Sequence, residues 1–95
     1  MKFVWHWEWD INNLELETEL STKFQKALEK HPEKFPKMSP TRFTGRTKGF
    51  RVIEAESEEQ VLNLVAFWAG AETWKLTPFF EGYTQAWQYW NNWKP

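Results

Sequence analysis

Hydrophobic and polar side chains alternate along residues 2–9, which is the pattern of a β-strand with two different faces. One face of this predicted strand is strongly apolar and carries Phe3, Trp5, Trp7 and Trp9. The other face carries Val4, His6 and Glu8. We therefore expect the tryptophans to belong mainly to the core, with a binding cage of aromatic rings as the alternative.

Hydrophobic residues then recur at helical spacing after the turn-forming residues Asp10, Asn12 and Asn13. The stripe that we expect to face the core consists of Leu16, Leu20, Phe24, Ala27 and Leu28. His31-Pro32 ends this predicted helix, because the residue before a proline disfavours the helical conformation.

The middle of the chain predicts an irregular connection followed by a hairpin. Residues 33–40 contain Pro36 and Pro40 and read as the connection. Residues 41–46 and 49–56 are expected to form two strands joined by a tight turn at residues 47–48, and Gly45 and Gly49 are available for a positive φ or a bulge.

A second helix is expected from Ser57, which forms a capping box with Gln60, to Gly70. Its apolar stripe consists of Val61, Leu64, Val65, Trp68 and Ala69. Residues 72–80 alternate again as a strand, and Pro78 indicates an edge position. A last helix is expected to pack on the body through one side, which carries Tyr83, Ala86, Trp87, Trp90 and Trp93.

This order predicts a single α+β domain over residues 1–95 with a ferredoxin-like β-α-β-β-α-β arrangement and a C-terminal helix. The antiparallel sheet is expected to have four strands in the order 4-1-3-2, with both crossover helices on one face. Phe3, Trp5, Trp7, Trp74 and Leu76 should then point towards those helices.

Composition narrows the classes of protein. The chain is 41% hydrophobic and 26% charged, with 8 Trp and 8 Phe, which is typical of a globular domain dominated by aromatic contacts. It has no cysteine, no signal-peptide pattern and no apolar run of membrane-spanning length, so we expect a cytoplasmic protein. The net charge is −1, but residues 30–51 hold seven basic residues and one acid, a segment that we interpret mainly as a solvated loop and hairpin.

The sheet face opposite the helices is too apolar to stay in water and too charged for a closed core. We expect a second copy of the chain to cover it, which would close two sheets into a barrel with a partly polar lumen. The residues predicted to bind a ligand in that lumen are His6, Glu8, Phe50, Val52, Glu54, Lys75 and Thr77.

Four stretches carry a resemblance that extends over nearly the whole chain: the N-terminal "HW" strand, "GFRVIEAES", "AFWAG" and "WKLTPFFE". They resemble a family of short bacterial domains of unknown function that is grouped with the dimeric α+β barrel proteins. The resemblance implies this fold and a homodimer, and it implies no activity.

Three functions remain open at this point. The first is a non-enzymatic dimeric module that either binds a small hydrophobic or aromatic molecule in the lumen or acts through protein contacts. We expect no cofactor or metal in it, since His6 and His31 are the only histidines. The second is a cofactor-independent enzyme, an oxygenase, isomerase or cyclase, with His6 as general base, Glu54 or Glu8 orienting it, and Lys75 stabilising negative charge.

The third function is RNA binding by the sheet face. "KGFRVIEA" begins like the third-strand motif of RNA recognition modules, and Arg42, Arg46, Lys48 and Arg51 are basic. Val52 and Ala55 stand where such modules place aromatic residues, and the chain as a whole is slightly acidic. RNA binding is therefore the least favoured of the three functions, and we do not expect a nucleic-acid partner. We also expect no membrane partner, because basic residues that would attract anionic lipid are nearly absent near the C-terminal tryptophans.

Overall fold

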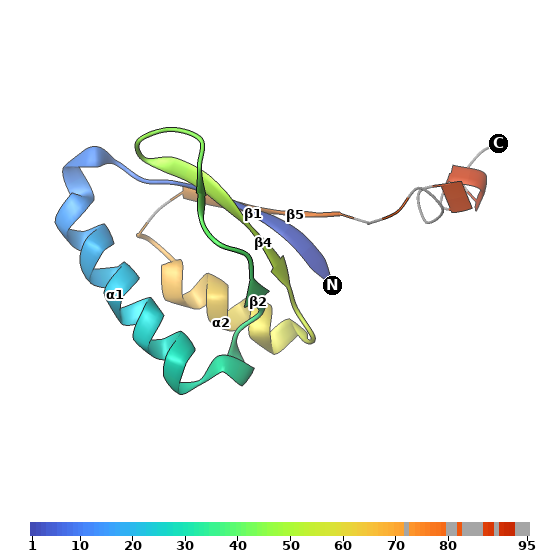
Figure 1. Cartoon of the computed structure of the whole chain (residues 1–95), viewed down its shortest axis with the longest axis horizontal. Coiled ribbons are helices and arrows are strands. Elements are labelled where there is room, and N and C mark those ends of the chain that lie inside the picture. The colour runs from blue at the N-terminus through green and yellow to red at the C-terminus, as the bar shows by residue number, and fades with distance from the viewer. Residues whose placement is uncertain (72, 80–81, 83–86, 89, 93–95) are drawn as a thin grey trace.

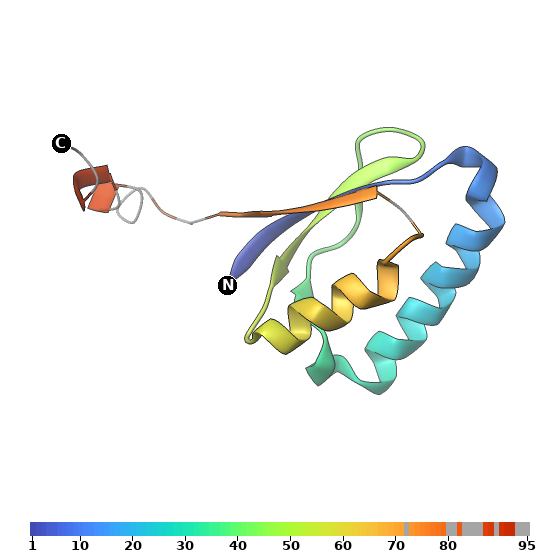
Figure 2. The ribbon, with the colours of Figure 1, turned by 180° about the vertical axis from the view of Figure 1, so that it is seen from behind.

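The computed structural model of the chain describes residues 1–71, 73–79, 82, 87–88 and 90–92. Its elements follow one another as β1 (Lys2–Glu8), η1 (Ile11–Asn13), α1 (Leu14–Lys30), η2 (Pro32–Lys34), β2 (Lys37–Met38), β3 (Arg42–Phe43), β4 (Lys48–Glu54), α2 (Glu58–Trp68) and β5 (Thr73–Pro78). Helices α1 and α2 lie on the same side of the sheet, and the other side faces away from them (Figures 1 and 2). The α+β class is therefore confirmed.

The sheet is antiparallel, and β1 lies between β4 and β5. The path across the sheet runs β2-β4-β1-β5, and β3 also pairs with β4. The expected four-strand arrangement is not matched in full, because the single strand expected over residues 41–46 is replaced by two strands of two residues each. One of them, β2, lies in the segment that we expected to be irregular.

This edge of the sheet is held partly by a side chain instead of a long ladder. Ser39 Oγ accepts a hydrogen bond from the Val52 amide at 2.8 Å, and the Ser39 amide donates to the Val52 carbonyl at 2.8 Å. Pro40 follows directly and has no amide hydrogen to donate. The chain therefore leaves β4 after β2 and returns to it at β3.

The helices begin and end close to the expected residues. Asp10 caps η1 by accepting from the Asn12 amide at 2.9 Å, and α1 follows directly. Helix α1 ends at Lys30, just before His31-Pro32, as predicted. Helix α2 has Ser57 as its N-cap, and Gly70 adopts the left-handed conformation with a φ of 78° just after its end.

Aromatic rings form the core between the helices and the sheet. Phe24 of α1 is central: its ring centroid lies 5.4 Å from that of Trp68, 5.6 Å from Phe35 and 6.3 Å from Trp5. Trp5 and Trp7 are buried, and Phe3, Trp74 and Leu76 pack against the same cluster. The prediction that these five residues face the helices is confirmed.

Two expectations about apolar residues are wrong. Leu16, which we placed on the buried stripe of α1, is 44% exposed. Trp87 and Trp90 are 53% and 57% exposed, so they do not pack as a buried stripe on the body. The red segments that contain residues 87–88 and 90–92 lie beyond the end of β5, away from α1 and α2 (Figure 1). Tyr83, Ala86 and Trp93 of the same predicted stripe lie outside the described residues.

Candidate functional site

The seven residues predicted to bind a ligand lie on the sheet face that the helices leave uncovered, because each shares its register with the face of His6. Two rows cross the three long strands. His6 pairs with Phe50 on one side and Lys75 on the other. Val4 pairs in the same way with Val52 and Thr77. The structure therefore brings five of the seven predicted residues into two adjacent rows.

The two remaining predicted residues, Glu8 and Glu54, lie at opposite ends of this face. Each stands directly across from a lysine: Glu8 pairs with Lys48, and Glu54 pairs with Lys2. The middle of the face is half-buried and largely apolar, with Val4, Phe50, Val52 and Thr77. We call the face formed by the even-numbered residues of β1 and β4, together with Lys75 and Thr77, the open sheet face.

The enzyme hypothesis offers His6 two carboxylates: Glu8 is two residues along β1 on the same face, about 7 Å along the strand, whereas Glu54 is not beside His6. Glu54 is four residues along β4 from Phe50, the cross-strand partner of His6, which is about 14 Å along the strand. His6 is exposed, and among the described residues its ring contacts that of Phe50, with centroids 6.2 Å apart. The register therefore gives His6 a lysine and a phenylalanine as neighbours.

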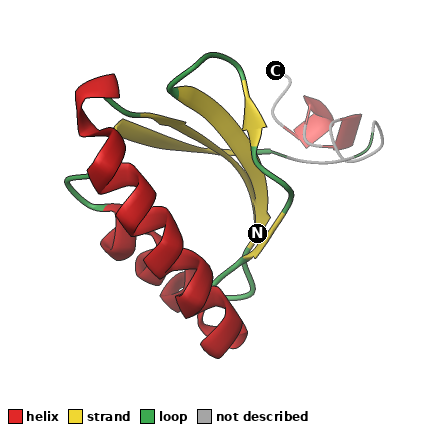
Figure 3. Ribbon diagram, turned by 60° about the vertical axis from the view of Figure 1, so that its left-hand side comes forward, coloured by secondary structure: helices red, strands yellow, loops and turns green. Residues whose placement is uncertain are grey.

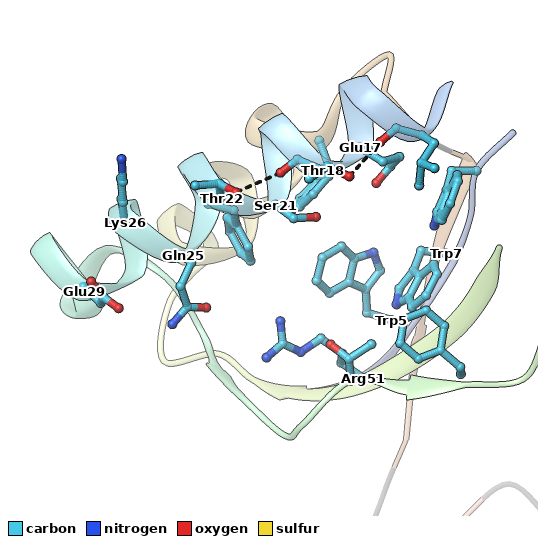
Figure 4. A pocket seen from close by; sticks show the side chains of 16 residues that line it. Trp5, Trp7, Glu17, Thr18, Ser21, Thr22, Gln25, Lys26, Glu29 and Arg51 are labelled. Carbon is cyan, nitrogen blue, oxygen red and sulfur yellow. Dashed lines mark hydrogen bonds between the residues drawn. The ribbon is translucent and has the colours of Figure 1, made fainter. Parts of the chain in front are cut away.

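A cavity of about 770 Å³ lies on the opposite face of the sheet, between α1 and the strands β1 and β4. None of the seven predicted residues lines it. Its apolar lining includes Trp5, Trp7, Phe24 and Trp68. Polar residues of α1 also border it (Figure 4). This volume is within the range of ordinary small-molecule sites. We call it the helix-side cavity.

Arg51 extends into the helix-side cavity from β4 (Figure 4). Its register partner is Trp5, which places it on the helix-facing side with Gly49 and Ile53. Its Nε donates a hydrogen bond to the Ser39 carbonyl at 2.9 Å. Burial of the guanidinium lowers the pKa of Arg51 from its ordinary value, because desolvation disfavours the charged form.

Carboxylates also line the helix-side cavity. Glu17 is buried and comes from the first part of α1, on the wall opposite the sheet (Figure 4). Lys26 and Glu29 are exposed and border the cavity further along the same helix. The lining of the cavity thus combines the buried side chain of Glu17 with the half-buried guanidinium of Arg51.

Trp68 supplies a further polar atom to this region. Its Nε1 is buried and has no hydrogen-bond partner among the described residues. A buried donor without a partner destabilises the folded state by about 1–3 kcal/mol. Trp68 and Trp5 belong to the same aromatic lining of the cavity, and their rings are in contact.

The helix-side cavity was not predicted from the sequence, although two polar residues at core positions indicate it. Arg51 alternates with Phe50 and Val52, so it falls on the same face of its strand as Ile53, where a cation is unusual. Glu17 falls on the apolar stripe of α1, seven residues before Phe24. Polar residues at predicted core positions of two facing elements are an indication of a site.

The described residues contain neither a cluster of metal-binding side chains nor a membrane-spanning helix. Among the described residues, no three histidine, aspartate or glutamate side chains gather as a metal site would require. The described helices include none with the length and apolar character needed to cross a lipid bilayer.

Comparison with known families matches residues 1–89 to the domain of unknown function DUF3303. The chain belongs to this family. Neither the curated proteins nor the solved structures give a match to it. The family match agrees with the resemblance to a short domain of unknown function, and its description carries no activity, ligand or superfamily.

Proposed function

We propose that this DUF3303 chain is a non-enzymatic module that pairs with a second copy through the open sheet face, as dimeric α+β barrel proteins do, and binds a small hydrophobic or aromatic molecule between the two sheets. The observation that carries the proposal is the pattern of this face, where half-buried Val4, Phe50 and Val52 lie in the middle. Helices α1 and α2 cannot cover these side chains, because both lie on the other side of the sheet (Figure 3). Contiguous apolar surface of this kind marks an interaction site.

The charges on the open sheet face support a second copy of the same chain as the partner. Lysine and glutamate stand across from each other at each end, as Glu8 with Lys48 and Lys2 with Glu54. An interface with an apolar middle and a charged rim is typical of protein pairs. A twofold pair of such faces can set each acidic residue against a lysine of the other copy, so the face is complementary to itself.

The open sheet face alone is too small to form a stable dimer interface. Strands of seven residues are about 24 Å long, and three neighbouring strands are about 14 Å wide, a footprint of about 340 Å². A stable interface buries about 800 Å² on each partner. Exposed Trp87 and Trp90, which lie beyond β5, are the natural source of the remaining contact area.

The ligand would lie over the row formed by Val4, Val52 and Thr77, beside the row formed by His6, Phe50 and Lys75. Packed sheets stand about 10 Å apart, which leaves room for a flat molecule where the side chains are short. Val4, Val52 and Thr77 have the shorter side chains of the two rows. The polar atoms of His6 and Lys75 would orient such a molecule without acting on it.

The first test is the mass of the protein in solution. We expect analytical ultracentrifugation to give twice the 11.5 kDa mass of the chain at micromolar concentrations. Phe50→Glu should shift the protein to the monomer, because it places a charge in the apolar middle of the face without touching the core. Leu62→Glu is the matched control, because Leu62 is 64% exposed on α2 and should leave the dimer intact.

Two outcomes would contradict the proposal. A wild-type chain that sediments as a monomer at tens of micromolar leaves the open sheet face in water. A dimer that survives Phe50→Glu but dissociates with Leu62→Glu places the interface on the helices instead. Circular dichroism of both variants checks that each has kept its fold.

A further inference from the structure

The helix-side cavity has the composition of a binding site for a flat aromatic molecule. The indoles of Trp5 and Trp7 belong to β1 and are 4% and 8% exposed, so they are held in place by the core. Trp5 and Trp7 also point into the cavity (Figure 4). Rigid aromatic side chains that serve both the core and a cavity wall offer a flat, preformed surface for stacking an aromatic ring.

Arg51 gives this aromatic surface one strong polar anchor. Arg51 Nε donates a hydrogen bond to the Ser39 carbonyl, and this bond orients the guanidinium. No carboxylate forms an ion pair with Arg51 in the part of the chain that the structure describes. A partly desolvated guanidinium with its terminal nitrogens directed into a cavity favours a planar anion, because it can donate two parallel hydrogen bonds to a carboxylate.

Glu17 limits the charge that such a ligand can carry. Its carboxylate comes from the α1 wall, and Arg51 comes from the sheet wall (Figure 4). One acidic group beside Arg51 gains its hydrogen bonds, whereas a second acidic group at the far end of the molecule would lose water beside the buried side chain of Glu17, which offers it no positive charge. The cavity therefore fits a monoanion better than a dianion.

We propose that the helix-side cavity binds an aromatic monocarboxylate, with its ring against Trp5 and Trp7 and its carboxylate on Arg51. This site lies within a single chain and on the other side of the sheet from the proposed dimer interface. It is consequently independent of dimerisation, and a monomeric variant such as Phe50→Glu keeps it.

Isothermal titration calorimetry with three probes tests the site. We expect naphthoate to bind at least tenfold more tightly than neutral naphthamide, because only the acid engages Arg51. We also expect naphthoate to bind more tightly than naphthalenedicarboxylate, because the second acid would lose water beside Glu17. Equal affinities for naphthoate and naphthamide, or no binding of naphthoate at millimolar concentration, would overturn the proposal.

Variants then locate the bound acid. Arg51→Met keeps most of the length and apolar stem of the side chain and should weaken naphthoate at least tenfold while leaving naphthamide unchanged. Arg51→Lys should bind naphthoate with an affinity between those of the wild type and Arg51→Met, since an ammonium keeps the charge but cannot form the paired hydrogen bonds. Arg46→Met is the matched control, because Arg46 is exposed in the hairpin and does not line the cavity.

Unchanged naphthoate affinity in Arg51→Met would show that the acid binds elsewhere and would overturn the assignment. Thermal denaturation of each variant checks folding, and Arg51→Lys keeps the test valid if Arg51→Met loses stability. Repeating the titration with Phe50→Glu separates the two proposals. Retained binding by a monomer supports the helix-side cavity, and binding that is lost with the dimer contradicts it.

Discussion

Gly49 lies where two strands and an indole ring come together. A side chain here would meet the backbone carbonyl oxygen of Arg42 on β3, and its Cβ would stand 2.7 Å from the ring of Trp7. The described residues have positive φ at Gly70 and Gly82, and Gly49 is not among them. Our expectation of a positive φ at Gly45 or Gly49 is therefore wrong, and what requires glycine at position 49 is the closeness of its neighbours.

We expect Gly49→Ala to lower the free energy of unfolding by about 1–3 kcal/mol, the usual cost of adding atoms to a closely packed site. The backbone of β3 or the buried ring of Trp7 must move to admit the methyl group. Chemical denaturation measures the change.

Gly45→Ala provides the matched control for this substitution. Its Cβ would meet only the side chain of Lys48, at 2.9 Å. Lys48 is exposed and can move away, so the unfolding free energy should change by less than about 0.5 kcal/mol. Equal losses in the two variants would contradict the account of Gly49.

At the scale of elements, Gln60 at the start of α2 takes part both in the helix cap and in a contact with η2. Ser57 Oγ accepts from the Gln60 amide at 3.3 Å, as the capping-box pattern predicts. The Gln60 side chain, however, accepts from the Glu56 amide at 2.7 Å and donates to the Glu33 carbonyl at 3.0 Å. Gln60 thereby joins α2 to η2, a contact between residues far apart in the sequence.

We expect Ser57→Ala to lower the free energy of unfolding by about 1 kcal/mol, because the Gln60 amide loses its side-chain acceptor at the helix N-terminus. Ser57→Asp should retain most of the stability, since aspartate caps equally well and its charge suits the helix dipole. Urea denaturation of the three proteins gives the comparison. A loss in Ser57→Asp as large as in Ser57→Ala would show that the cap is not what matters at this position.

At the scale of the whole molecule, the exposed tryptophans after β5 are the least expected feature. Trp87 and Trp90 are more than half exposed, although large aromatic side chains normally dominate cores and interfaces. Burial by a second copy would explain both tryptophans together with the small footprint of the open sheet face.

The double substitution Trp87→Ala with Trp90→Ala should accordingly weaken the dimer at least tenfold without unfolding the monomer. The reason is that each indole would bury its area against the partner and contributes little to the core of its own chain. Sedimentation equilibrium at several concentrations measures the dissociation constant. If thermal denaturation shows the variant unfolded under conditions that keep Phe50→Glu folded, the tryptophans belong to the core of the single chain.

Local patterns in the sequence determined much of the architecture. Period-two alternation over residues 2–9 placed Trp5 and Trp7 towards the helices, because strand geometry forces alternate side chains to opposite faces. Ser57, Gly70 and His31-Pro32 marked helix boundaries through chemistry confined to a few neighbouring residues. Four short stretches of the sequence also carried the resemblance to a domain of unknown function, and the family match agrees with it.

Only the tertiary structure decided which residues come together across elements. The two-residue strands β2 and β3 depend on how Ser39 meets β4, and the separation of His6 from Glu54 depends on strand register. The helix-side cavity exists because α1 and β4 place Glu17 and Arg51 on facing walls, a relation between positions 34 residues apart that no local pattern contains. Spacing along the chain sets which way a side chain points, whereas packing sets what it meets.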